Sequence, residues 1–161
     1  MNWDRSALYL GVEVMKSDVI ARDPEAPPLR LDNEPDEIHC DGLQLYLRFS
    51  PDDAVYGWLV VPSTRGDLVV RAVSDSAADA SWARGSWQPT EGGYTMSFAV
   101  TPPGWTIPHA GDTVEFDLLI NRMLPDRARR VGQLVWSGGG GWVWLRGDRQ
   151  DPERFGLLAF R

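Results

Sequence analysis

The chain has 161 residues, of which 16 are basic and 23 acidic, giving a formal net charge of −7. An acidic chain lacks the positive field that attracts phosphate, so nucleic acids and membrane surfaces are excluded as main partners. No stretch of about 18 apolar residues exists to span a bilayer. The one cysteine, Cys40, excludes an intramolecular disulfide and a zinc site built from cysteines. We expect one domain over residues 1–161.

Alternation of apolar and polar residues, the period of a β-strand, dominates the chain. Leu43, Leu45 and Leu47 share one face of a strand, while Gln44 and Tyr46 share the other. The same pattern predicts strands at residues 8–15, 43–49, 56–61, 68–73, 82–88, 94–100, 114–121, 133–137, 141–145 and 155–160. Short strands joined by polar turns predict an all-β fold, a two-sheet antiparallel β-sandwich of immunoglobulin-like or jelly-roll-like type.

The inward faces of these strands define a predicted core. We expect seven apolar residues to be buried together: Leu10, Val12, Leu45, Leu47, Phe98, Phe116 and Leu118. Trp136 is also expected to pack in the core. The strand near residues 7–15 begins almost at once.

The longest irregular segment, residues 17–41, ends in an acidic run. Asp32, Asp36 and Asp41 in this run could supply oxygen ligands to calcium, which accepts carboxylates on flexible loops. The spacing does not match the helix-flanked calcium loop. A solvated acidic loop is therefore the alternative interpretation.

A glycine-rich segment with tryptophans, residues 136–144, is the most unusual in the chain. Its four glycines let a ligand approach the backbone closely, and the indole of Trp144, with Trp142 as a second candidate, could stack on a sugar ring. The alternative is a hairpin whose tryptophans cover the end of the sandwich. Glu115 and Asp117, two apart on one strand face, raise the further alternative of a glycoside hydrolase.

Several segments in order resemble the family 9 carbohydrate-binding modules, and the match runs nearly end to end. They are Trp3-Asp4-x-x-x-Leu8-Tyr9-Leu10, Asp41-Gly42-Leu43-Gln44-Leu45-Tyr46-Leu47, Glu91-Gly92-Gly93-Tyr94, Phe116-Asp117-Leu118-Leu119-Ile120-Asn121, Arg130-Val131-Gly132-Gln133-Leu134-Val135-Trp136-Ser137 and Asp151-Pro152-x-x-Phe155-Gly156. The resemblance implies a calcium-containing β-sandwich that binds sugars. It also implies that this chain lacks the one or two strands that open the family domain. We therefore expect the position beside the strand near residues 7–15 to be vacant or filled by another chain.

The resemblance carries over residue by residue only in part. Of the two tryptophans that clamp the sugar in the family, one corresponds to Trp144 and the other to Ile38. A glutamate that hydrogen-bonds the sugar corresponds to Gln44, and an amide can still make that bond without the charge. Tyr46 and Arg71 are added as candidates because they point outward in the strand pattern.

These observations favour a non-catalytic, lectin-like domain that binds a poly- or oligosaccharide weakly, by aromatic stacking. The resemblance implies an accessory domain beside a catalytic or surface domain in an extracellular or periplasmic protein. One alternative is a structural or protein-interaction sandwich that has lost the sugar site, and Ile38 in place of a clamp tryptophan favours it. A glycoside hydrolase is the second alternative.

Overall fold

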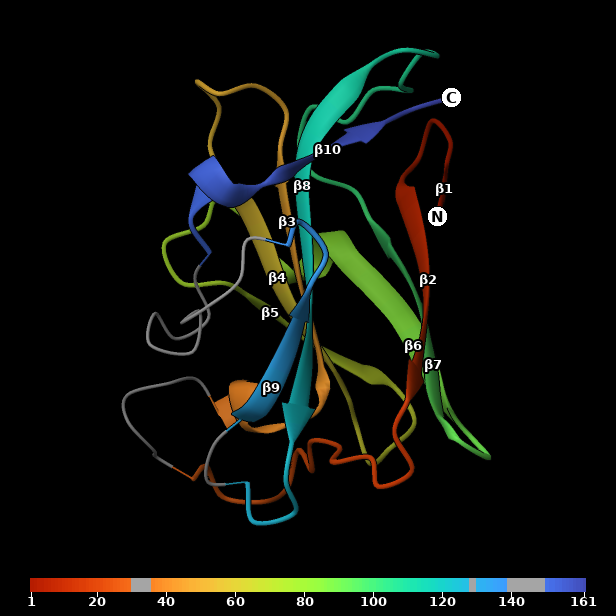
Figure 1. The fold of residues 1–161 in the computed structure, drawn as a ribbon, viewed down its shortest axis with the longest axis vertical. Coiled ribbons are helices and arrows are strands. Elements are labelled where there is room, and N and C mark those ends of the chain that lie inside the picture. Colours follow the sequence, from red (N-terminus) through yellow and green to blue (C-terminus); the bar gives the residue numbers. More distant parts are fainter. Residues whose placement is uncertain (30–35, 128–129, 139–149) are drawn as a thin grey trace.

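A computed structural model describes residues 1–29, 36–127, 130–138 and 150–161. These residues form two antiparallel β-sheets that pack face to face, joined by turns and by short 3₁₀ segments (Figure 1). No helix in the described part of the chain is long and apolar enough to cross a membrane.

The first sheet has four strands in the order β1-β2-β7-β6. Its members are β1 (Asn2–Trp3), β2 (Leu8–Met15), β6 (Ala83–Thr90) and β7 (Gly93–Val100). β7 pairs along its whole length with β2 on one side and β6 on the other. It is therefore the central strand of this sheet.

The second sheet has six strands, in the order β10-β8-β3-β4-β5 with β9 paired to β8. Its members are β3 (Gly42–Arg48), β4 (Tyr56–Pro62), β5 (Leu68–Ala72), β8 (Thr113–Met123), β9 (Arg130–Val135) and β10 (Gly156–Ala159). β8 is long enough to pair with β3 on one side and with both β10 and β9 on the other. Three 3₁₀ helices complete the described structure: η1 (Asp36–His39), η2 (Ala80–Trp82) and η4 (Pro152–Arg154).

The strand predictions are confirmed, with boundaries shifted by at most three residues, everywhere the structure describes the chain. The all-β, two-sheet antiparallel class is confirmed as well. β1 was not predicted, because two residues carry no period. The strand expected at residues 141–145 lies outside the described residues.

The core between the sheets contains the residues that alternation assigned to it. Leu10, Leu45, Leu47, Phe98 and Phe116 are all buried in one cluster. Val12 and Leu118 are only partly buried and pack against its margin.

The expectation that Trp136 lies in the core is wrong, because its side chain is 52% exposed. The indole lies at the margin of the core, where it meets the ring of Phe116 edge-on with 5.0 Å between centroids.

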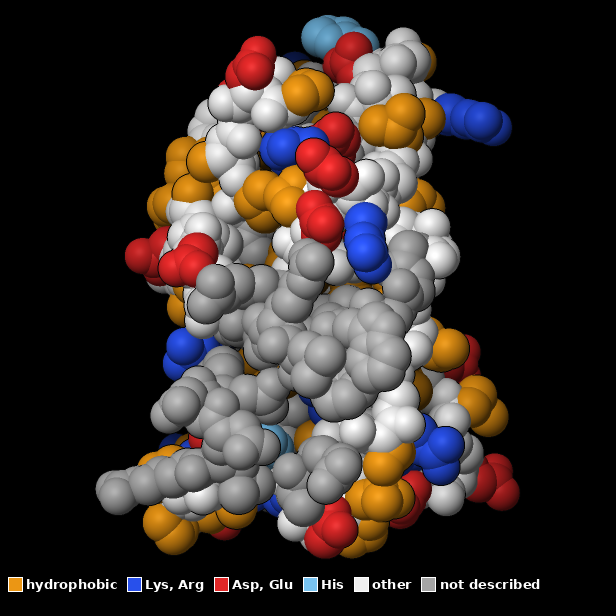
Figure 2. Space-filling model, turned by 60° about the vertical axis from the view of Figure 1, so that its left-hand side comes forward, with side chains coloured by type: hydrophobic (Ala, Val, Ile, Leu, Met, Phe, Trp, Pro, Cys, Tyr) orange, Lys and Arg blue, Asp and Glu red, His pale blue; other side chains and the backbone are white. Residues whose placement is uncertain are grey.

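The six-stranded sheet is buried on its outer face too. One apolar cluster there joins Ile38 and Cys40 to Leu59 and Val61 of β4. A second joins Tyr46, Val73 and Leu119, with Phe155 packed against them. Figure 2 views the molecule from this side, where acidic and basic side chains are interspersed over the surface.

Candidate functional site

The register of the six-stranded sheet brings polar residues from three strands together on its outer face. Gln44 of β3 pairs with Leu119 of β8, and Leu119 pairs with Val135 of β9. Two residues further along β8, Asn121 pairs with Gln133 of β9. Because side chains alternate along a strand, Gln44, Asn121 and Gln133 all point to this one face.

These three amides, the amide cluster, are linked by hydrogen bonds. Gln133 Nε2 donates to Gln44 Oε1 at 3.0 Å and to Asn121 Oδ1 at 2.6 Å. Gln44 Nε2 donates to the Tyr46 hydroxyl at 2.7 Å, and Arg130 Nη1 approaches Gln44 Oε1 at 3.4 Å. The network holds each amide in one orientation.

Burial differs sharply within the amide cluster. Gln44 and Asn121 are buried at 0% and 1% exposure, whereas Gln133 is half-buried. The Nδ2 of Asn121 has no hydrogen-bond partner among the described residues. A buried donor without a partner is rare and calls for an explanation such as a bound group.

Asp117 lies on the same face, and its carboxylate is fully engaged. Its side chain is buried, and Oδ2 accepts from Ser137 Oγ at 3.0 Å and from Gln150 Nε2 at 2.8 Å. Oδ1 accepts from the backbone N–H of Ser137 at 3.1 Å. Asp117 therefore ties the end of β9 and the segment before η4 to the sheet.

The arrangement of Glu115 does not resemble that of a glycosidase carboxylate. Its carboxylate forms an ion pair with Arg48 on the neighbouring strand, and both side chains are largely covered. Its strand neighbour Asp117 is occupied by hydrogen bonds. Among the described residues, both acids are thus engaged by neighbouring side chains.

The remaining candidates lie at different depths. Tyr46 points to the outer face of the sheet, as expected, but it is buried there at 1% exposure, so a ligand on the surface does not reach its ring. Phe155 covers Tyr46, with 5.7 Å between the ring centroids.

Arg71 of β5 is exposed on the same face, across β4 from Gln44. Trp142 and Trp144 lie outside the described residues.

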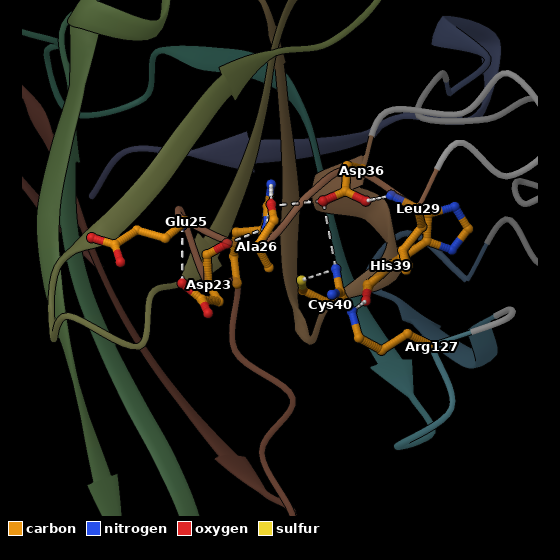
Figure 3. A network of polar contacts seen from close by, with 9 residues as sticks. Asp23, Glu25, Ala26, Leu29, Asp36, His39, Cys40 and Arg127 are labelled. Atoms are coloured by element: carbon orange, nitrogen blue, oxygen red, sulfur yellow. Dashed lines mark hydrogen bonds and ion pairs between the residues drawn. The ribbon is translucent and has the colours of Figure 1, made fainter.

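Basic side chains form ion pairs with Asp36 and Asp41, two of the carboxylates predicted as calcium ligands. Asp36 Oδ2 lies 2.9 Å from Arg22 Nε. The same oxygen lies 3.6 Å from Arg127 Nη2, and Asp36 Oδ1 accepts from the N–H of Leu29 at 2.7 Å (Figure 3). Asp41 is paired with Lys16. Within the described residues, no group of three or more His, Cys, Asp or Glu side chains could hold a metal. Asp36 and Asp41 do not fit a calcium site; Asp32 lies outside the described residues.

Sequence reasoning missed Asn121, Gln133 and Arg130 as site residues. Alternation already placed Asn121 on the face that carries Glu115 and Asp117. The link from Gln133 to Gln44 spans 89 residues of sequence. It depends on the pairing of β9 with β8, which no local pattern reveals.

Comparison with known proteins identifies the fold. No family model and no curated protein matches the sequence. Two solved structures of a family 9 carbohydrate-binding module from Caldicellulosiruptor kristjanssonii are similar. The complex with cellotriose is 19% identical, with a TM-score of 0.66, covering 98% of this chain and 70% of that one. The complex with glucose is 18% identical, with a TM-score of 0.67, covering 99% and 73%. The chain therefore has the β-sandwich fold of the family 9 carbohydrate-binding modules.

Proposed function

We propose that this protein is a non-catalytic carbohydrate-binding domain whose ligand lies on the outer face of the six-stranded sheet. The observation that carries the proposal is the amide cluster, which combines donors and acceptors without a free carboxylate. Primary amides both donate and accept hydrogen bonds, as sugar hydroxyls do. The structural neighbours are modules in complex with cellotriose and with glucose, so a glucose-containing oligosaccharide is the first ligand to test.

The burial of each residue indicates whether it contacts the sugar directly in this proposal. Gln133 and Arg130 are half-buried, so a ligand on the surface reaches them first. Gln44 and Asn121 lie beneath, which makes Gln44 a positioning residue that orients Gln133 and Arg130 rather than a direct contact. Arg71 is exposed on the same face and can extend the contact toward a second sugar unit.

Aromatic stacking completes the proposed site. Trp144 supplies the flat apolar surface that covers the C–H face of a pyranose ring, and Trp142 is the second candidate. Ile38 of η1, which stands in place of the other clamp tryptophan, is fully buried against β4 and offers no platform. With one platform, we expect weak affinity, on the order of millimolar or about 4 kcal/mol.

The burial of Ile38 also supports a second candidate function, a structural or protein-interaction domain of the same fold. Both functions are those of an accessory domain, and in either case we expect the parent protein to be extracellular or periplasmic. A glycoside hydrolase receives no support from the paired and buried states of Glu115 and Asp117.

Titration with glucose and cellotriose, followed by nuclear magnetic resonance of the side-chain amides, tests the proposal. We expect the Gln133 amide signals to shift on titration, and Gln133→Ala to weaken binding at least about tenfold, or 1.4 kcal/mol. Gln88→Ala is the matched control, because Gln88 is an exposed glutamine on β6 of the other sheet.

The stacking role is tested in the same titration. Trp144→Ala should abolish measurable binding, whereas Trp136→Ala, which removes an exposed indole near the core margin, should retain it. Circular dichroism verifies that each variant is folded. Saccharides that leave every amide signal in place, or a Trp144→Ala variant that binds like the parent, would favour the interaction domain instead.

A further inference from the structure

One end of the sandwich is held together by a buried carboxylate, Asp41. Its side chain is 0% exposed, and both of its oxygens accept hydrogen bonds. Oδ2 accepts from the N–H of Ile20 at 2.7 Å, and Oδ1 accepts from the N–H of Met123 at 2.8 Å. Asp41 thus joins the loop after β2, the start of β3 and the end of β8, and a buried charge at such a junction requires a compensating positive charge.

The compensating charge is the ammonium group of Lys16. Its Nζ lies 2.6 Å from Asp41 Oδ2, and the Lys16 side chain is only 7% exposed. The same Nζ donates to the carbonyl oxygen of Asp18 and lies 3.5 Å from Asp18 Oδ1. Carboxylate and carbonyl oxygens around one point are the ligand types that bind calcium, yet here they surround a lysine.

Lys16 is the only lysine among the 16 basic residues of the chain. An ammonium is a compact point charge with three donors in tetrahedral directions, whereas a guanidinium is a broad planar fork. Oxygens converging from separate segments on one point suit the ammonium. Another carboxylate, Asp36, forms ion pairs with the guanidinium groups of Arg22 and Arg127. Figure 3 shows Arg127 beside it.

We propose that the Lys16 ammonium acts as a resident cation at Asp41 and takes the place of a divalent metal ion in joining these three segments. The chain therefore needs no calcium at Asp41 to stabilise this end of the sandwich. Its own basic side chains supply the positive charges that a metal would otherwise bring, at Asp36 as well as at Asp41.

Thermal unfolding in excess EDTA and in millimolar CaCl2, followed by circular dichroism, tests this proposal on the unmodified protein. We expect the same Tm in both solutions. A Tm that rises with calcium in the parent chain but not in Asp41→Asn would make Asp41 a metal ligand and overturn the proposal. A calcium effect that persists in Asp41→Asn but disappears in Asp36→Asn would overturn the proposal at Asp36. One that persists in both variants arises at other carboxylates and agrees with the proposal.

A charge-removing variant tests the role of the lysine directly. Lys16→Met retains the length of the side chain but not its charge, and we expect its Tm to fall by several degrees. Arg5→Met, which removes one exposed positive charge, is the control and should leave the Tm unchanged. In the Lys16→Met background, adding Asp41→Asn should lower the Tm less than Asp41→Asn does in the parent protein. The added change there removes the buried carboxylate charge that Lys16→Met leaves without a partner. A Lys16→Met variant that is as stable as Arg5→Met would refute the proposal.

Discussion

At the scale of single residues, burial decides the chemistry of the side chains on the outer face of the six-stranded sheet. The thiol of Cys40 is an example, since it is fully buried beside Ile38 and Leu59. Burial raises the pKa of Cys40 to about 11, because the thiolate would lose its hydration, although the charge of nearby Arg127 opposes the rise. Cys40 is therefore a packing residue and not a nucleophile.

This pKa predicts a pH dependence of stability. Between pH 9 and pH 11 the unfolded chain releases the thiol proton, whereas the folded chain retains it, so folding becomes less favourable as pH rises. The full loss corresponds to about 2–3 kcal/mol above the folded pKa. Urea unfolding at several pH values, compared with Cys40→Ala, should show this loss only in the parent. Parallel pH profiles would contradict the burial of the thiol.

At the scale of elements, the start of β7 lies very close to the backbone at the end of β2. Gly93 begins β7 opposite Met15 of β2, and a Cβ built on it would lie 1.8 Å from the carbonyl oxygen of Val14. Backbone atoms cannot yield as the end of a flexible side chain can. The close approach of β2 and β7 therefore depends on this glycine.

We accordingly expect Gly93→Ala to lower the free energy of unfolding by about 3 kcal/mol or more, in the upper range for overpacking. Gly132→Ala in β9 is the matched control, because a Cβ there meets nothing within 4 Å. It should change stability by less than about 0.5 kcal/mol. Chemical denaturation of both variants provides the comparison. Equal stability of the two would show that β2 and β7 can separate at little cost.

At the scale of the whole molecule, the four-stranded sheet has an incompletely covered edge. β1 pairs only with Leu8 and Tyr9 of β2. Beyond them, residues 10–15 pair with β7 alone within the described part of the chain. The sequence-based expectation of an open neighbour position thus stands for most of this strand, and such an edge offers N–H and C=O groups to a second chain.

Amide hydrogen exchange measures whether this edge is open or filled. In dilute protein, alternate amides of residues 10–15 should exchange rapidly, while the amides of the central strand β7 stay protected. Protection at residues 10–15 that grows with protein concentration would identify pairing with another copy. Protection of all these amides at every concentration would exclude an open edge.

The sequence by itself determined the strands and their two faces. Alternation is a local property, set by the direction of successive side chains, so the period alone assigns Leu45, Phe98 and Phe116 to the core, where they lie. The resemblance to the family 9 modules likewise predicted the fold that the structural neighbours share. Trp136 was placed wrongly because it follows the last residue of β9, where alternation no longer determines what covers a side chain.

Only the tertiary structure determined which segments cover each face of a sheet and which basic group pairs with each buried carboxylate. The period of β3 is compatible with Gln44 and Tyr46 in water, yet both are buried, because segments distant in sequence cover them. Gln133 meets Gln44 across 89 residues, and Lys16 meets Asp41 across 25. Such contacts depend on strand register and loop closure, which arise from the packing of the whole chain and leave no period in the sequence.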